Sequence, residues 1–150
     1  MASNRFDIVI VGAGFAGMYM LHKARKLGLS ARVLEAGTGV GGTWYWNRYP
    51  GARVDIESMQ YSYQFDDDLA QDWDWPEKYS PQPQLLKYAN HVAERFDLFK
   101  DIQFNTRVAS AKYDETAAEW TLTAEDGSET IGRFYVMATG CLSVPNRPHI

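Results

Sequence analysis

The 150-residue sequence is 45% hydrophobic and carries a formal net charge of −4, so it can bury one ordinary core and gives no electrostatic reason to expect nucleic acid. Its single cysteine, Cys141, excludes an intramolecular disulfide framework, and with three widely spaced histidines it forms no metal-ligand pattern. Because no signal peptide is evident and no apolar run approaches the ~20 residues that span a bilayer, we expect no membrane association and a cytoplasmic location.

The N-terminal residues show a strand–helix–strand pattern. Residues 6–11 are a β-branched apolar run, typical of a buried parallel strand. Residues 16–27 have helical periodicity, with Ala16 and Leu27 on the apolar face and His22 on the charged face, and Gly28 is a natural stop. Residues 30–35 predict a second strand that ends in an acid. A glycine-rich turn joins the first strand to the helix and consists of Gly12, Ala13, Gly14, Phe15, Ala16 and Gly17.

The position of this turn makes it a dinucleotide fingerprint, since a GxGxxG motif lies between a strand and a helix and an acid follows the second strand. Gly12 allows a tight turn, Gly14 lets the backbone approach a pyrophosphate, and Gly17 lets the helix pack closely on the strand. The helix N-terminus favours the phosphates. Glu35 should accept hydrogen bonds from the adenosine ribose and repel a 2′-phosphate, which predicts FAD or NAD rather than NADP. The alternative is a glycine-rich turn of another α/β fold with a chance acid nearby.

Residues 41–55 are the most unusual stretch of the chain, with glycines, large aromatic residues and arginines close together. Their apolar residues follow neither the helix nor the strand period, and Pro50-Gly51 marks a turn. We therefore predict a structured loop. It follows the second strand closely, so it should lie near the carboxyl ends of the first two strands, where open α/β sheets bind ligands.

The middle of the chain is aromatic and acidic. We interpret residues 66–68 as a solvated turn rather than a metal cluster, and Trp73 and Trp75 as packing anchors, with a partner or substrate surface as the alternative. A helix should begin near Pro83, and His91 beside its apolar stripe is expected to be structural. The stripe comprises Leu85, Tyr88, Ala89, Val92, Phe96 and Phe99.

The last third predicts strands at residues 102–108, 108–114, 119–124 and 133–140, with a tight turn at residues 125–128. The predicted fold class is α/β: a Rossmann-like FAD-binding fold, in which helices cover a parallel sheet, plus a small antiparallel β-meander.

At this point the motifs resemble a known family. The stretch 41–55 resembles the second fingerprint of the type I Baeyer–Villiger monooxygenases, in which a small residue, Gly, any residue, Trp, four residues, an aromatic, Pro and Gly precede an Asp. The matching residues are Gly41, Gly42, Trp44, Tyr49, Pro50, Gly51 and Asp55. The glycine turn, Glu35 and the sequence Ala138-Thr139-Gly140 are also similar to that family, although many flavoproteins share them.

The resemblance implies an enzyme that holds FAD in this first nucleotide-binding fold and NADPH mainly in a second fold that this chain does not contain. Reduced flavin would react with O2 to give a flavin peroxide, which attacks a small-molecule ketone and yields an ester or lactone. The residues that the resemblance places on the cofactors are Gly12, Ala13, Gly14, Phe15, Ala16, Gly17, Glu35, Gly42, Thr43, Trp44, Arg53, Asp55, Ile56, Tyr61, Val108, Ala138, Thr139 and Gly140.

Within this set, Thr43 and Trp44 are expected along the flavin, the backbone of Val108 near the adenine, and Thr139-Gly140 over the cofactor. Arg53 is expected to approach the nicotinamide cofactor.

Asp55 is the expected catalytic residue. The resemblance gives it the role of positioning a catalytic arginine near the peroxide, and a carboxylate can hold a guanidinium where negative charge develops. The sequence pattern alone supports a different role, in which Asp55 caps a helix that begins near Glu57. Both roles can hold at once.

We expect residues 1–150 to be the N-terminal part of an FAD-binding domain. The family's Phe-Gly…His…Trp fingerprint, the second nucleotide-binding fold and the catalytic arginine are expected beyond Ile150, so this segment alone should complete no turnover. Two other functions fit the motifs: an FAD-binding part of a flavin monooxygenase that oxidises nitrogen or sulfur, and a non-catalytic nucleotide-binding module.

Overall fold

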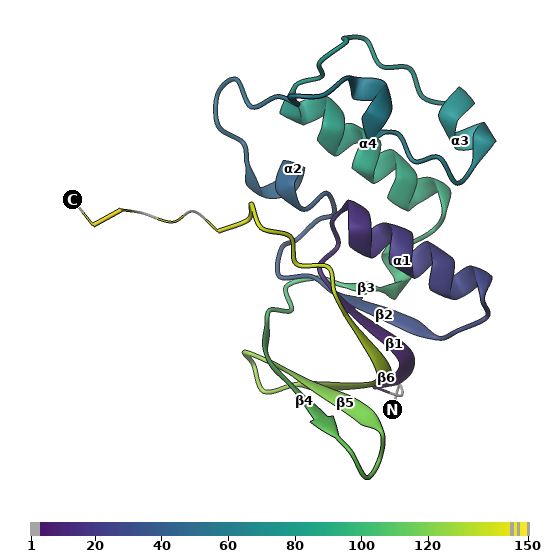
Figure 1. The fold of residues 1–150 in the computed structure, drawn as a ribbon, viewed down its shortest axis with the longest axis vertical. Helices are drawn as coiled ribbons and strands as arrows, with labels where there is room; N and C mark the ends of the chain where they lie inside the picture. Colours follow the sequence, from purple (N-terminus) through teal and green to yellow (C-terminus); the bar gives the residue numbers. More distant parts are fainter. Residues whose placement is uncertain (1–3, 145, 147, 150) are drawn as a thin grey trace.

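The computed structural model describes residues 4–144, 146, 148 and 149 and shows a six-stranded sheet with helices gathered at one side (Figure 1). The elements in chain order are β1 Arg5–Val11, α1 Phe15–Lys26, β2 Ala31–Leu34, α2 Thr43–Trp46, η1 Ser58–Tyr61, α3 Asp67–Gln71, α4 Gln82–Arg95, η2 Phe99–Asp101, β3 Ile102–Gln103, β4 Val108–Asp114, β5 Glu119–Ala124 and β6 Glu129–Met137. No helix among the described residues is long and apolar enough to span a membrane.

The sheet has a parallel half and an antiparallel half, in the order β3-β2-β1-β6-β5-β4. In the parallel half β1 lies between β2 and β6, and Ile10 is in register with Val33 on one side and Val136 on the other. In the other half β6, β5 and β4 form an antiparallel meander. The predicted fold class is therefore confirmed, including the junction of parallel sheet and meander.

The two faces of the parallel half are covered by different elements. Ile8 and Ile10 of β1 pack in one cluster with Leu21 of α1 and Ala89 and Ala93 of α4. On the opposite face of β1, Val9 packs with Leu34 of β2 and Leu122 of β5, so the meander supplies the second cover. Alternating side chains of one strand thus enter two separate cores, as a strand buried on both faces requires.

The structure corrects the prediction for α1. His22, predicted on the polar face, is 8% exposed because Phe65 and Phe96 enclose it, with ring centroids 4.4 and 4.7 Å away. Leu27, predicted on the apolar face, is 71% exposed because it lies at the helix C-cap, beyond the layer that α1 covers. Ala16 is also exposed, at the N-terminal end of the helix.

Other predicted boundaries shift for local reasons. The loop at 41–55 contains a one-turn helix, α2. The strand predicted at 102–108 is reduced to Ile102–Gln103, because Asn105 has a φ of +53° and its N–H bonds to the carbonyl of Gly37. Asp66, predicted in a solvated turn, is the N-cap of α3 and accepts a hydrogen bond from Leu69 N at 2.8 Å. Residues 138–140 lie beyond the end of β6.

Candidate cofactor-binding site

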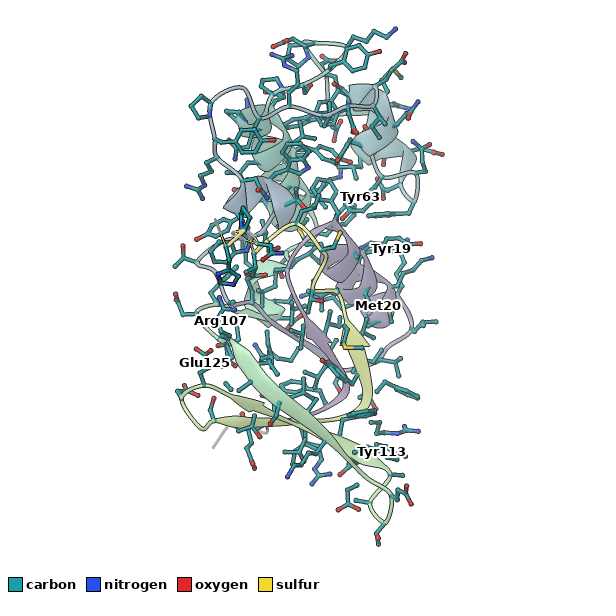
Figure 2. All side chains as sticks on the ribbon, turned by 60° about the vertical axis from the view of Figure 1, so that its left-hand side comes forward. Tyr19, Met20, Tyr63, Arg107, Tyr113 and Glu125 are labelled. Carbon is teal, nitrogen blue, oxygen red and sulfur yellow. The ribbon has the colours of Figure 1, made fainter. Side chains whose placement is uncertain are left out.

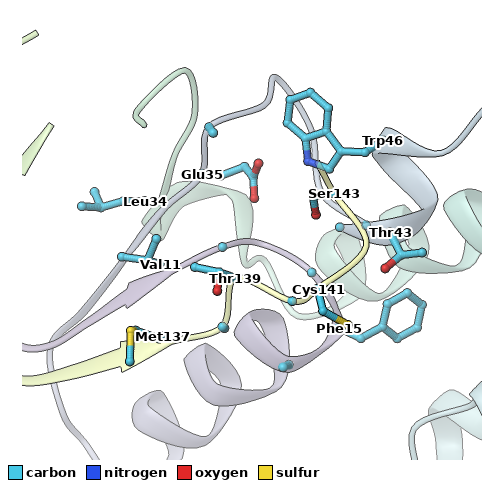
Figure 3. A pocket seen from close by; sticks show the side chains of 18 of the residues that line it. Val11, Phe15, Leu34, Glu35, Thr43, Trp46, Met137, Thr139, Cys141 and Ser143 are labelled. Atoms are coloured by element: carbon cyan, nitrogen blue, oxygen red, sulfur yellow. The ribbon is translucent and has the colours of Figure 1, made fainter. Parts of the chain in front are cut away.

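A cleft of about 680 Å³ opens where the parallel strands end (Figure 3). Val11 ends β1, Leu34 ends β2 and Met137 ends β6, and all three line the cleft. Its remaining lining comes from the glycine turn, Glu35 and Ala36, residues 41–44, Trp46, Tyr61, residues 106–108, residues 138–141, Ser143 and Val144. This position is where open α/β sheets bind their ligands, and the volume lies within the usual range for small-molecule sites, about 300–1,000 Å³.

Two glycines of the turn are required by close backbone contacts. Gly12 has a φ of +103°, and a Cβ there would lie 2.5 Å from the carbonyl oxygen of Ala138. A Cβ on Gly17 would lie 1.9 Å from the carbonyl oxygen of Gly12. A side chain at Gly12 would push the turn away from the residue that follows β6, and a side chain at Gly17 would push α1 away from the turn. The packing role predicted for Gly17 therefore agrees with the geometry.

The N-terminus of α1 is suited to an anion. Its N-cap, Gly14, has extended backbone geometry, no side chain of the described residues caps it, and the first turn holds no acidic residue. The first N–H groups of a helix have no intrahelical partner and carry partial positive charge. Since Gly14, Phe15 and Ala16 line the cleft, a phosphate placed there would meet these donors.

Glu35 has a structural task that the sequence did not indicate. Its side chain is 5% exposed, with Oε2 accepting from Ala13 N and Oε1 accepting from Gly37 N, each at 2.7 Å. The carboxylate therefore joins the glycine turn to the chain that follows β2. It also lines the cleft, and each carboxylate oxygen has a second lone pair with which to accept from a ligand hydroxyl.

The second glycine pair packs against the first motif. Gly41 N donates to the carbonyl of Ala13 at 3.0 Å. Gly42 has a φ of +54°, and a Cβ there would lie 2.9 Å from the Cα of Gly14. Two motifs that are separate in sequence thus share one close backbone contact at the floor of the cleft.

Aromatic side chains form the wall next to α2. Trp44 is buried and contacts Tyr61 edge-to-face at a centroid distance of 5.7 Å, and Phe15 contacts Tyr61 at 5.8 Å. Burial raises the pKa of the Tyr61 phenol, the hydrogen bond with Trp44 opposes this shift, and the charge of Asp55 adds to it. Behind this wall Tyr63 stacks on Tyr19 over α1 (Figure 2).

The cleft brings together most of the residues predicted to bind cofactor: Gly12, Gly14, Phe15, Ala16, Glu35, Gly42, Thr43, Trp44, Tyr61, Val108, Ala138, Thr139 and Gly140. Ala13 and Gly17 lie directly behind it, where both are buried. Arg53, Asp55 and Ile56 are not among its lining residues.

Several lining residues were not predicted. The strand ends Val11, Leu34 and Met137 could have been found from the rule that ligands bind beyond strand carboxyl ends. Arg107, whose guanidinium lies 3.8 Å from Glu125 (Figure 2), gave no signal beyond its place next to Val108. The other unpredicted lining residues are Ala36, Gly41, Trp46, Thr106, Cys141, Ser143 and Val144.

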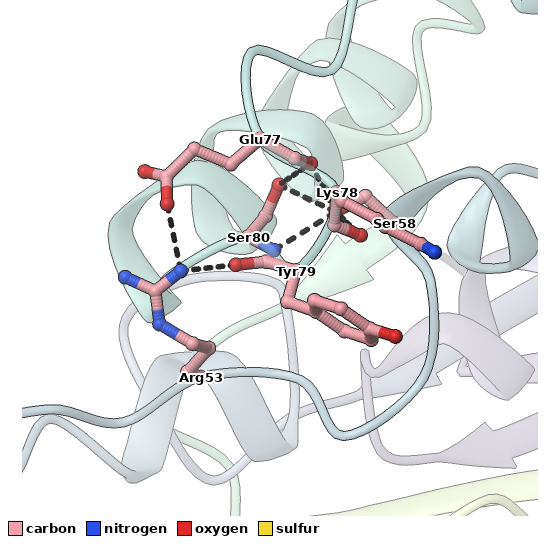
Figure 4. A network of polar contacts seen from close by, with 6 residues as sticks. All are labelled: Arg53, Ser58, Glu77, Lys78, Tyr79 and Ser80. Atoms are coloured by element: carbon pink, nitrogen blue, oxygen red, sulfur yellow. Dashed lines mark hydrogen bonds and ion pairs between the residues drawn. The ribbon is translucent and has the colours of Figure 1, made fainter.

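Arg53 belongs to a polar network outside the cleft (Figure 4). Its guanidinium pairs with Glu77 at 2.7 Å and donates to the carbonyl of Tyr79. Ser58 Oγ lies in the same network, 2.8 Å from Ser80 Oγ. These bonds fix residues 53–58 to the segment that precedes α4.

Asp55 is exposed and does not cap the following helix. The N-cap of η1 is Glu57, and no side-chain hydrogen bond caps that helix in the described chain. The capping alternative is therefore wrong. Asp55 forms no ion pair with a described residue, so its carboxylate is available to a cation from elsewhere. No group of three or more potential metal ligands occurs among the described residues.

Comparison with known proteins gives a consistent result. The NAD(P)-binding Rossmann-like domain family matches residues 10–73. Phenazine N-monooxygenase PhzNO1 of Lysobacter antibioticus is 50% identical, covering 93% of this chain and 26% of the relative. Acetone monooxygenase (methyl acetate-forming) of Gordonia sp. strain TY-5 is 43% identical, covering 97% of this chain and 27% of the relative. Conversion of acetone to methyl acetate is the insertion of one oxygen beside a carbonyl.

The chain is a homologue of the Baeyer–Villiger monooxygenases. A solved structure, oxidized steroid monooxygenase bound to NADP, superimposes with a TM-score of 0.93 at 54% identity and covers 97% of this chain and 28% of that one. The chain spans about a quarter of the length of the curated relatives it matches.

Proposed function

We propose that this chain is the N-terminal FAD-binding part of a monooxygenase that uses NADPH and O2 to convert a ketone into an ester or lactone. The observation that carries the proposal is the contact of Gly42 with Gly14, which joins the aromatic loop to the dinucleotide fingerprint at one cleft. A glycine-rich turn alone would support many nucleotide-binding proteins. Here the two motifs meet in a homologue of the Baeyer–Villiger monooxygenases, which supports a flavin-dependent monooxygenase.

The residues present fit FAD. The uncapped N-terminus of α1 would hold the pyrophosphate, and the carboxylate of Glu35 would accept from the ribose hydroxyls. Trp44 and Tyr61 would form the wall beside the flavin, and Val108 would meet the adenine region. When bound, the flavin would supply electron transfer to O2. The chain's own contribution is to bind the cofactor, orient it and exclude water from one side.

Asp55 would act as a positioning residue for the reaction, because its exposed carboxylate can hold an arginine contributed by another part of the protein. The negative charge of Asp55 already contributes to the raised pKa of Tyr61 at the cleft wall. Arg53 would have to leave its ion pair with Glu77 to reach a nicotinamide cofactor. NADPH would be held mainly by residues outside this chain. We infer a cytoplasmic location from the single cysteine.

Oxidation of an aromatic nitrogen is a second candidate activity, because the 50%-identical relative is a phenazine N-monooxygenase. Both reactions would use the same FAD site, so the FAD-binding half of the proposal does not depend on the choice. The substrate pocket would decide between them, and it is expected outside this segment.

The test has two parts. The purified chain, incubated with FAD and desalted, should retain flavin absorbance, and a Gly12→Val variant should retain none because its side chain would meet the Ala138 carbonyl. Absence of flavin from the unaltered, folded chain would refute the site. The full-length protein, given NADPH and O2, should form a lactone from a cyclic ketone. Formation of an N-oxide from a phenazine, without any lactone from the ketone, would establish the second candidate instead.

A further inference from the structure

The segment that leaves β6 forms part of the lining of the cleft. Ala138 N makes the last bond to β1, to Val11 O at 2.9 Å, and Gly140, with a φ of +67°, then redirects the chain. Figure 3 shows the segment running past Thr139 and Cys141 to Ser143, which lies beside Trp46 of α2. We name residues 139–144 the exit segment.

Few packing contacts hold the exit segment in place. Leu142 is 62% exposed and Val144 77% exposed, so neither side chain anchors it to a core. Burial of apolar area is what normally fixes a chain segment. Polar contacts must therefore hold the exit segment in its place at the cleft.

Asn47 supplies such a contact from the end of α2, the helix whose residues Thr43, Trp44 and Trp46 line the cleft. This residue is the C-cap of α2, and its Nδ2 donates to Leu142 O at 2.7 Å and to Thr43 O at 3.0 Å. The amide carries two N–H donors, one for each carbonyl. The Thr43 bond fixes the direction of the side chain, and the Leu142 bond joins α2 to the exit segment.

The α2 side of this contact is rigid. Trp44 is buried, Gln82 Nε2 donates to its carbonyl oxygen, and Gly41 N is bonded to Ala13 O. A bond from Asn47 therefore attaches the exposed exit segment to an element that is itself fixed to the glycine turn.

We propose that Asn47 is a latch that retains the dinucleotide, by holding the exit segment to the end of α2 through its hydrogen bond to Leu142. This inference rests on the proposed FAD site. A dinucleotide bound in the cleft would lie between α2 and the exit segment, which both line it, so separation of these two elements would open a way out for the ligand. Release then requires the Asn47–Leu142 bond to break, and removing that bond speeds release about 2- to 10-fold, the usual effect of one net hydrogen bond.

The experiment measures the rate of FAD release from the loaded chain by flavin fluorescence, after rapid dilution to a concentration at which released FAD does not rebind. The variants are Asn47→Ala, which removes both bonds, and Asn47→Asp, which keeps the shape but cannot donate. The matched control is Asn90→Ala. Asn90 is also half-buried and donates to the carbonyl four residues earlier, Leu86 O at 2.8 Å, but this bond lies within α4 and does not involve the exit segment.

We expect both Asn47 variants to release FAD about 2- to 10-fold faster than the unaltered chain, and Asn90→Ala to release it at the unaltered rate. Without FAD, Asn47→Ala and Asn90→Ala should lose the same amount of thermal stability. Unchanged release from both Asn47 variants overturns the latch, and so does an equal acceleration in Asn90→Ala, which would reveal a general loss of helix stability. Failure of the unaltered chain to bind FAD overturns the proposed function, and the latch with it.

Discussion

Glu35→Gln should destabilise the chain even when no cofactor is bound. The buried carboxylate accepts from Ala13 N and Gly37 N, so it bonds one donor through each oxygen. Glutamine has only one side-chain oxygen, and its NH2 group would face the other backbone donor. One buried N–H then loses its acceptor, which costs about 1–3 kcal/mol.

Glu35→Ala removes both acceptors and should cost about 2–6 kcal/mol by the same reasoning. That loss is comparable to the whole stability of many domains, about 5–15 kcal/mol, so the glutamine variant is the more informative one.

The assay is equilibrium urea unfolding of the cofactor-free chain, followed by tryptophan fluorescence. Glu57→Gln is the matched control, because Glu57 is 48% exposed and its only ion pair with a described residue is the surface contact with Lys78 at 2.9 Å. Loss of this ion pair should change the free energy of unfolding by less than about 1 kcal/mol. If Glu35→Gln unfolds with the stability of the unaltered chain and weakens only FAD binding, the bracing role is refuted and the carboxylate serves the ligand alone.

Three further predictions concern other parts of the molecule. Gly42→Ala should lower both the melting temperature and FAD affinity because its Cβ would lie 2.9 Å from Gly14, whereas Gly51→Ala, also at positive φ but with open space around it, should leave FAD affinity unchanged; equal losses of affinity would refute the contact argument. Burial lowers the folded-state pKa of His22 below its ordinary value of 6.5, so the unfolded chain binds more protons as pH falls through 6.5 and the free energy of unfolding should decline there. His22→Leu should flatten that decline in urea titrations between pH 7.5 and 5.5, and an unaltered slope would contradict it. Asp55→Asn in the full-length protein should lower the rate of ester formation with normal flavin content, and unchanged turnover would remove Asp55 from the mechanism.

Much of the fold follows from local patterns. The alternation in residues 108–114 and 119–124 predicts β4 and β5 with the bounds that the structure shows. The run ending at Val11 predicts a strand buried on both faces, because continuous β-branched residues suit no half-exposed strand. The ends of strands were harder to predict. Near the end of β3, Asn105 has left-handed backbone geometry and stops the strand, although the strand-like side-chain pattern continues to residue 108.

Burial on α1 shows where local patterns fail. The helical period predicts one buried face, which the sheet covers, and that part is correct for Leu21 and Ala24. His22 lies on another face, and only the arrival of Phe65 and Phe96 from later in the chain buries it. A period within one helix contains no information about how many neighbours will pack around that helix.

The sequence by itself determined the βαβ unit, the glycine positions and the acid after β2, because each depends on the conformation or polarity of neighbouring residues. Only the tertiary structure decided that Gly42 meets Gly14, that the oxygens of Glu35 bond to backbone donors, and that Asn47 reaches Leu142. Apart from the bond between Glu35 and Gly37, these contacts join residues far apart in the chain. They exist because the strand ends converge at one edge of the sheet, where short distances follow from topology rather than from spacing along the sequence.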